Sequence, residues 1–324
     1  MSLPAKIFAK GVAMTARGRG LDQLAILMLA LFWGLNWPAV RTALFDLPPW
    51  TLRAIGMGAG ALFLLVVALI RGERLRLARG EWLPVLAAGF LTITFFNMLL
   101  AFAQLAAPTT RAVIVTFTLP VWTVIFARIF LGERLDRRRQ TGLAFGIAGL
   151  ICLGWPLIRA GTFSHGLVLA LIAGMSWALG TVVIKRFPLR SPPISAATWQ
   201  LAAGAVVAVL GMALFEPQVL RDGLDWPRFQ TGTWIALFHH IVFSQALAYL
   251  IWYNLLGRLP AGTVSLSMLM VPAIGVISSV LLLGERPTAA DFAGLVLMTM
   301  AACAVMLPMG KARGSAARQA RAKV

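Results

Sequence analysis

The chain has 324 residues, of which 60% are hydrophobic and only 12% are charged. Its 29 Lys and Arg residues against 11 Asp and Glu residues give a formal net charge of +18, which in a soluble protein would indicate a nucleic-acid partner. The mean hydropathy of +0.84 excludes that interpretation, because a soluble domain needs far more polar residues to cover its surface. The composition predicts an integral membrane protein.

Ten apolar stretches are long enough to cross the hydrocarbon core as helices, which takes roughly 20 residues each. We therefore expect an all-α membrane protein with ten transmembrane helices at about residues 24–40, 50–70, 82–105, 112–131, 141–157, 166–184, 194–215, 233–256, 261–283 and 289–307. The basic segments 1–21 and 310–324 lie outside these spans and are expected to be cytoplasmic.

The positive charge is distributed unevenly along the ten spans. If the N-terminus is cytoplasmic, most Lys and Arg residues fall at the inner face, while the outer face receives Arg41, Arg53, Arg111, Arg159, Arg221, Arg228 and Arg286. Cytoplasmic loops of membrane proteins carry such an excess of basic residues. We expect both termini to be cytoplasmic and the protein to lie in a bacterial-type plasma (inner) membrane.

The chain also contains an internal repeat. The segment 131–134 (Leu-Gly-Glu-Arg) recurs 152 residues later as 283–286. The same offset relates Trp82 to Trp234, Pro108 to Pro260, Pro120 to Pro272 and Gly142 to Gly294, while an offset of 144 relates Trp33 to Trp177 and Arg41 to Lys185. The repeat predicts two five-helix halves, residues 22–160 and 161–309.

An odd number of helices in each half requires the second half to enter the membrane upside down relative to the first. Such inverted repeats are typical of secondary transporters, whose substrate site lies near the midplane between the halves. The sequence thus favours transport by alternating access through a central cavity.

The repeated units carry a family resemblance, since each half ends in an apolar span with a central Pro, a Leu-Gly-Glu-Arg segment and a Gly-containing final span. The chain resembles an EamA-type member of the drug/metabolite transporter superfamily, with a YddG-like amino-acid exporter as the preferred branch. The resemblance implies ten helices, cytoplasmic termini and export of amino acids or other small metabolites. A multidrug or sugar-phosphate transporter of the same fold is the alternative.

The expected partners are a small-molecule substrate and the lipid bilayer. We expect no nucleic acid, no cofactor and no metal, and a monomer or weak homodimer. An intramembrane enzyme is disfavoured because the spans contain no nucleophile–base pair or metal-binding motif.

No Asp or Glu falls in the middle of a span, which removes the commonest device for proton coupling. This favours facilitated diffusion, or a coupling that uses the histidines. Glu133 and Glu285 precede the fifth and tenth spans. Each is expected either to cap the helix that follows or to form a gate ion pair with a basic residue.

Polar and aromatic residues within the spans are the candidate lining of the cavity. In the first span, Trp33, Asn36 and Trp37 share one face, and Pro38 interrupts the backbone hydrogen bonding. In the equivalent sixth span, Trp177 and Thr181 have the same spacing. Packing of Trp33 and Trp177, and interfacial anchoring of Trp37, remain alternatives.

The third and eighth spans supply Asn97 and Gln104, and Gln245, Tyr249 and Trp252, respectively. In an α-helix His240 and Ser244 lie on another face from Gln245 and Tyr249, so we expect the two faces to have different neighbours. Interhelical hydrogen bonds are the alternative for His239 and His240. The fourth and ninth spans add Thr118 and the paired helix breakers Pro120 and Pro272.

A cavity of this composition has no net charge and suits a neutral or zwitterionic solute with an apolar part. Aromatic rings can hold an apolar side chain or an ammonium group, and amides can address a carboxylate. A sugar-phosphate carrier would need Lys or Arg in the middle of a span, and Lys185, which comes nearest to this, lies at a span end.

Overall fold

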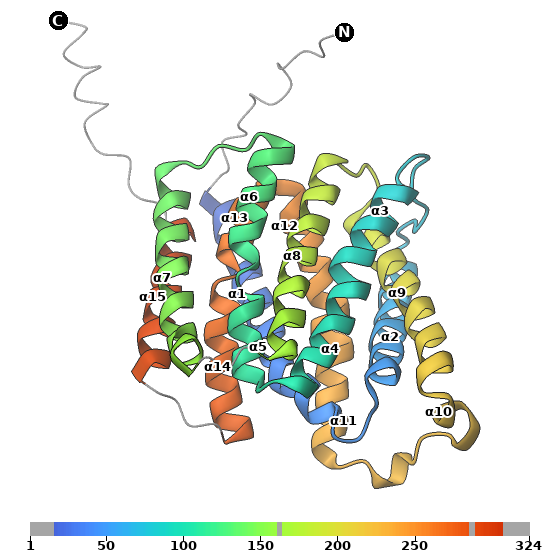
Figure 1. Cartoon of the computed structure of the whole chain (residues 1–324). Coiled ribbons are helices and arrows are strands. Elements are labelled where there is room, and N and C mark those ends of the chain that lie inside the picture. The colour runs from blue at the N-terminus through green and yellow to red at the C-terminus, as the bar shows by residue number, and fades with distance from the viewer. Residues whose placement is uncertain (1–15, 161–163, 285–288, 307–324) are drawn as a thin grey trace, which may run out of the picture.

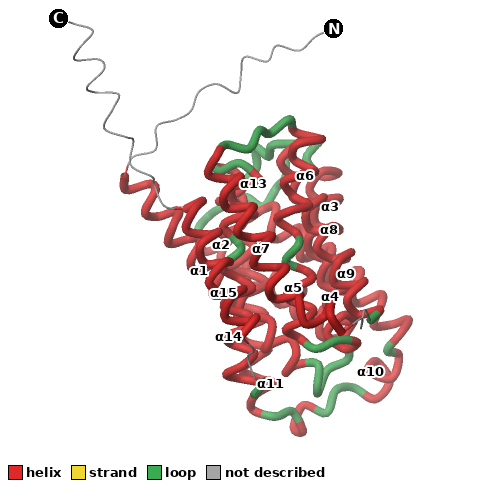
Figure 2. The backbone as a smooth tube through the Cα atoms, turned by 60° about the vertical axis from the view of Figure 1, so that its left-hand side comes forward, coloured by secondary structure: helices red, strands yellow, loops and turns green. Residues whose placement is uncertain are grey.

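The computed structural model describes residues 16–160, 164–284 and 289–306. Within these residues all regular secondary structure is helical (Figure 2), which confirms the expected all-α class, while the inverted repeat of two five-helix halves stays a prediction. Continuous apolar runs without strand-like alternation account for this, because a buried backbone in hydrocarbon satisfies its hydrogen bonds within a helix. Glu285 lies outside the described residues, so neither of its expected roles can be examined.

The helices follow one another with short connections. In chain order they are α1 (Ala16–Ala43), α2 (Pro49–Ile70), α3 (Trp82–Gly89), η2 (Phe90–Phe95), α4 (Phe96–Ala106), α5 (Thr109–Thr116), α6 (Leu119–Leu131), α7 (Arg137–Ala160), α8 (His165–Arg186), α9 (Pro193–Phe215), α10 (Pro217–Asp222), η3 (Trp226–Arg228), α11 (Thr231–Phe238), η4 (His239–Leu247), α12 (Ala248–Arg258), α13 (Ala261–Ser267), α14 (Met270–Leu283) and α15 (Ala289–Met306).

Seven helical segments in the described part of the chain are long and apolar enough to cross a membrane: Gly20–Ala43, Pro49–Ile70, Trp82–Ala106, Thr109–Leu131, His165–Arg186, Pro193–Phe215 and Thr231–Arg258. Met270–Leu283 and Phe292–Ala301 are shorter apolar helices. The chain is therefore an integral membrane protein, whereas the count of ten spans stays a prediction that requires α7, α14 and α15 to cross as well.

The outer surface of the bundle is strongly apolar. Large hydrophobic side chains stand exposed on successive turns of several helices, among them Leu69, Ile70, Leu83, Leu214 and Leu281. Contiguous exposed apolar surface is rare on soluble monomers, so this surface fits contact with lipid.

Helices from the two halves of the chain pack in pairs. α2 packs along α9, α7 along α15, α1 along α14, and α6 along α8. Figure 1 shows the pair α7 and α15 at one side of the bundle and α2 and α9 at the other, with α1, α4, α8 and α12 between them. The central helices thus come from both halves of the sequence.

Several irregularities recur in the two halves. The π-helical segment η2 interrupts the third apolar stretch, and η4 interrupts the eighth. The fourth stretch breaks between α5 and α6, and the ninth breaks between α13 and α14. Gly132 and Gly284 end α6 and α14 with φ values of 68° and 70°, a left-handed conformation that favours glycine.

Candidate substrate cavity

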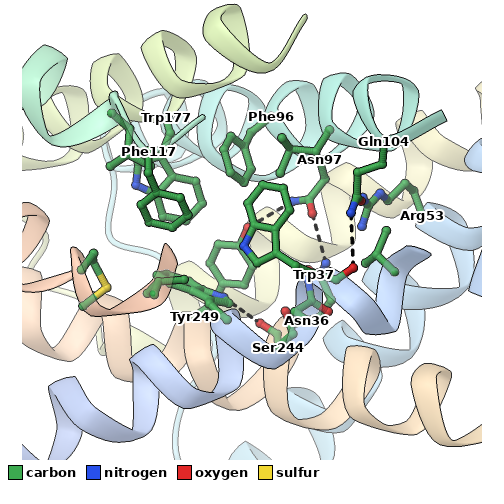
Figure 3. Close-up of a pocket in the computed structure, with 17 residues that line it drawn as sticks. Asn36, Trp37, Arg53, Phe96, Asn97, Gln104, Phe117, Trp177, Ser244 and Tyr249 are labelled. Atoms are coloured by element: carbon green, nitrogen blue, oxygen red, sulfur yellow. Dashed lines mark hydrogen bonds between the residues drawn. The ribbon is translucent and has the colours of Figure 1, made fainter. Parts of the chain in front are cut away.

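The centre of the bundle contains a cavity of about 60 Å³, which has room for roughly five water molecules. Figure 3 shows its lining. The residues are Trp33, Asn36, Trp37, Val40, Arg53, Phe96, Asn97, Leu100, Gln104, Phe117, Leu119, Trp177, Ser244, Gln245, Tyr249, Met268 and Val271. Eight of these were sequence candidates: Trp33, Asn36, Trp37, Asn97, Gln104, Trp177, Gln245 and Tyr249. Their role in binding a substrate stays a prediction.

One part of the cavity wall is a cluster of aromatic rings. The ring centroid of Trp33 lies 5.1 Å from that of Trp177 and 5.5 Å from that of Tyr249, both in edge-to-face arrangements. Phe96 packs 4.7 Å from Trp177. Trp252 lies behind this layer, fully buried and 5.4 Å from Trp177. It therefore supports the aromatic wall without lining the cavity itself.

A network of amides and hydroxyls continues the wall. Asn97 Nδ2 donates to the Tyr249 hydroxyl at 3.1 Å and to the Ile93 carbonyl at 2.8 Å. Tyr249 donates in turn to the Thr92 carbonyl at 3.2 Å, and Gln245 Nε2 donates to Asn97 Oδ1 at 3.4 Å. These bonds fix the side chains that face the cavity.

Two further contacts tie α1 to α4. Gln104 Nε2 donates to the carbonyl of Trp37 at 3.2 Å, and Arg41 donates to the carbonyl of Gln104 at 3.0 Å. Pro38 lies inside α1, directly after the residue whose carbonyl Gln104 engages.

The eighth apolar stretch does not have the two separate faces that the sequence predicted. Ser244, Gln245 and Tyr249 all line the cavity, and His240 Nε2 lies 3.4 Å from Gln245 Nε2. The reason is the π-helical geometry of η4, in which residues five apart stack, whereas in an α-helix they would point about 140° apart. His240 itself is fully buried beside the cavity.

The two histidines make interhelical hydrogen bonds, as the alternative interpretation predicted. His239 Nε2 lies 3.0 Å from the Phe32 carbonyl, and His240 Nδ1 lies 2.8 Å from Asn36 Oδ1. Since an amide oxygen only accepts, His240 Nδ1 carries the proton and Nε2 is an acceptor.

Arg53 does not lie where the sequence predicted. It was assigned to the outer aqueous face, but it lies in the second turn of α2, is 1% exposed and lines the cavity. Two features of α2 account for this position. Pro48 and Pro49 mark the helix start, and Arg53 shares a helix face with Gly56 and Gly60, which pack against η4. The expectation of an uncharged cavity was therefore wrong.

Other sequence candidates lie outside the cavity lining. Thr118 donates to the Val115 carbonyl at 2.9 Å and accepts from Trp122 Nε1, and Thr181 is fully buried within α8. Pro120 and Pro272 follow the breaks before α6 and α14. The breaks themselves reach the cavity, since Phe117 and Met268 line it.

Glu133 caps a helix from the other half of the chain. Its Oε1 accepts from the backbone N–H of Ala261 at 3.2 Å, in the first turn of α13. Its Oε2 lies 3.9 Å from Arg139 Nη1. The carboxylate thus contacts both a helix start and a basic side chain, and a role in gating stays a prediction.

The described residues contain no group of three or more His, Cys, Asp or Glu side chains that could hold a metal ion. A bundle of apolar helices thus surrounds an internal cavity with aromatic, amide and cationic walls. The EamA-like transporter family matches residues 22–155 and again residues 164–307. The chain belongs to this family, and it is a transporter rather than an enzyme.

Several relatives match over most of their length. The chain is 31% identical to the transporter YvbV of Bacillus subtilis, over 87% of this chain and 90% of that protein. It is 29% identical to a protein of Salmonella typhimurium named a probable amino-acid metabolite efflux pump, over 86% and 92%. A crystal structure with 22% identity matches with a TM-score of 0.70 over 89% of this chain and 98% of that one, which supports the fold.

Proposed function

We propose that the protein exports small metabolites, with aromatic or other neutral amino acids as the main class, by alternating access through the central cavity. The observation that carries the proposal is a cavity with an aromatic wall, amide groups and one cation, which matches a solute with an apolar side chain and a zwitterionic head. The relatives named as amino-acid metabolite efflux pumps support the same substrate class.

Alternating access rests on an inverted repeat of two five-helix halves, about residues 22–160 and 161–309. Two contacts support it. Arg41 donates to the carbonyl of Gln104 at 3.0 Å, and Lys185, its counterpart in the second half, donates to the carbonyl of Leu256 at 2.5 Å. Gln104 and Leu256 lie 152 residues apart, so the same contact joins the first and third apolar stretches within each half.

The transporter is proposed to lie in a bacterial-type inner membrane with both termini cytoplasmic. The basic segments 71–79, 134–139 and 185–190 lie at one end of the bundle, opposite α10 (Figure 1). An excess of Lys and Arg on one side is typical of the cytoplasmic face. We further propose that the protein works as a monomer or weak homodimer.

Transport is proposed to be facilitated diffusion, because the cavity lining holds no carboxylate that could carry a coupling proton. His240, which is buried beside the cavity, is a hydrogen-bond partner of Asn36.

The test is uptake into proteoliposomes that contain the purified protein. We expect accumulation of L-phenylalanine, L-leucine or L-threonine to equilibrium, with no dependence on an imposed pH gradient. Parallel assays with glucose 6-phosphate and with the organic cation tetraphenylphosphonium represent the alternative substrate classes. Movement of either of these without any amino acid would refute the substrate class, and flux that vanishes with the pH gradient would refute facilitated diffusion.

A further inference from the structure

Arg53 is a buried cation without a carboxylate partner. Its side chain is 1% exposed, and among the described residues no Asp or Glu lies within ion-pair distance of it. A buried charge is strongly unfavourable unless it is paired. Such a residue therefore needs a function that repays its burial.

Two acidic residues beside the start of α2 are already engaged. Glu216 accepts hydrogen bonds from the backbone N–H groups of Trp50 and Thr51. Asp46 accepts from the Thr233 hydroxyl at 2.5 Å and from the Gln230 backbone. Both carboxylates hold helix starts, so neither is available to neutralise Arg53.

The guanidinium is positioned from one side only. Arg53 Nη1 lies 3.4 Å from His240 Nε2, which is an acceptor because Nδ1 of the same ring donates to Asn36. Arg53 Nε has no hydrogen-bond partner within the described part of the chain, and the same holds for Gln245 Oε1. Both atoms are buried, so the wall of the cavity contains a donor on a cation and an amide acceptor that have no hydrogen-bond partner among the described residues.

The cavity is polar at one end and aromatic at the other. Figure 3 shows Arg53 and Gln104 on one side, Asn97 and Trp37 in the middle, and Trp177 and Phe117 on the opposite side. A solute bound along this axis would place an anionic group beside the guanidinium and an apolar group among the rings. The line from the polar end to the aromatic end of the cavity therefore predicts the orientation of the bound solute as well as its chemical class.

We propose that Arg53 binds the carboxylate of the transported solute, while Trp33, Trp177 and Phe117, which also line the cavity, receive its apolar side chain. The proposal rests on the proposed function and narrows it, because it requires a carboxylate and excludes amines and esters as good substrates. The planar guanidinium can form two parallel hydrogen bonds to a carboxylate, and Gln245 Oε1 can accept from an ammonium group.

The test is equilibrium binding to the purified full-length protein, with four probes that differ in their charged groups. The probes are L-phenylalanine, L-phenylalaninamide, 3-phenylpropionate and glucose 6-phosphate. In the unaltered protein we expect L-phenylalanine to bind about 10- to 100-fold more tightly than its amide, the range that a charge-assisted hydrogen bond provides. Equal affinities for acid and amide would overturn the proposal.

Variants then test whether Arg53 causes the difference in affinity between L-phenylalanine and its amide. Arg53→Gln should lower the affinity for L-phenylalanine by about 10- to 100-fold and leave the amide unchanged, so that the two bind alike. Arg53→Lys should retain part of the preference, because an ammonium keeps the charge but not the two-pronged geometry. Arg228→Gln, which removes the same charge from a side chain that is 86% exposed, is the control and should bind as the unaltered protein does.

The outcomes separate this inference from the proposed function. If amino acids are transported but Arg53→Gln retains the acid preference, the inference fails and the function stands. If no amino acid binds but 3-phenylpropionate does so through Arg53, the carboxylate site stands and the amino-acid function fails. Arg53-dependent binding of glucose 6-phosphate alone would overturn both. If Arg53→Gln does not fold, the relative affinities of the unaltered protein for L-phenylalanine and L-phenylalaninamide decide whether the inference stands.

Discussion

Asn97 donates a hydrogen bond to the hydroxyl of Tyr249 at 3.1 Å in the wall of the cavity, and these two residues lie 152 residues apart, the offset of the internal repeat. Each is the second residue of the helix that follows a π-helical segment. In the proposed twofold arrangement, equivalent residues can touch only beside the symmetry axis. The bond thus fits a symmetry axis that passes through the cavity. Rocking of one half against the other about this axis would change the width of the cavity.

The Asn97–Tyr249 bond should contribute measurably to stability. We expect a double-mutant cycle with Asn97→Leu and Tyr249→Phe to give a coupling energy of about 0.6 kcal/mol and at most ~1.7 kcal/mol, the range for hydrogen bonds between helices in membranes. Denaturation of the four proteins in detergent measures it. A coupling energy of zero would show that the bond does not form in solution.

Glycine is required at position 56 but not at position 58 of the same helix. A Cβ on Gly56 would lie 2.5 Å from His240 Nε2, whereas a Cβ on Gly58 would lie 3.8 Å from its nearest neighbour. Gly56→Ala should destabilise the protein by about 1–3 kcal/mol, because η4 must move. Gly58→Ala, the matched control, should be neutral or stabilising by up to ~1 kcal/mol. Thermal unfolding of both variants compares them, and equal effects would contradict the close packing of α2 on η4.

Glu216 caps the start of α2 from the end of α9. It accepts from the backbone N–H groups of Trp50 and Thr51, each at 2.8 Å, and from the Thr51 hydroxyl at 2.7 Å. Glu216→Gln should cost about 1–3 kcal/mol, the usual range when a charged acceptor is lost. Chemical denaturation can measure this. Asp222→Asn on the exposed end of α10 should have no effect, and a similar loss in both variants would argue against the cap.

Glu81 should make the stability depend on acid pH. Burial alone would raise the pKa of its carboxyl, but hydrogen bonds from the Ser191 hydroxyl and from the backbones of Arg190 and Ala78 lower it below the ordinary value of 4.5. A depressed folded-state pKa stabilises the protein above the unfolded value and loses that contribution as the pH falls through the folded value. Unfolding temperatures measured from pH 6 down to pH 3 should therefore decline less in Glu81→Gln than in the unaltered protein. Parallel curves would contradict this role.

The orientation in the membrane can be tested with single cysteines at exposed glycines. Gly72 and Gly223 have open space around them and lie in connections at opposite ends of the bundle (Figure 1). In a background with Cys152 and Cys303 replaced by Ser, a Gly223→Cys variant should react with an impermeant maleimide in intact cells, and a Gly72→Cys variant only after lysis. The reverse pattern would invert the proposed topology.

The sequence by itself determined the membrane class, the all-helical fold and most of the polar cavity lining. Apolar runs of about 20 residues permit only helices in hydrocarbon, and helical spacing groups Trp33, Asn36 and Trp37 on one face. The internal repeat, marked by the duplicated Leu-Gly-Glu-Arg segments, also indicated Trp177, Asn97 and Tyr249 as candidates, and the structure brings these residues together at the cavity. Local composition and periodicity carry this information, so no tertiary contact was needed to obtain it.

Only the tertiary structure decided where the charges and the eighth apolar stretch lie. The π-helical turn of η4 brings His240, Ser244 and Gln245 to one region, which regular α-helical spacing cannot predict. Glu133 caps α13, from the other half of the chain, because a helix end binds whichever carboxylate packs nearest. Arg53 enters the cavity because α2 packs its glycine face on η4, and burial depends on such neighbours from distant parts of the sequence.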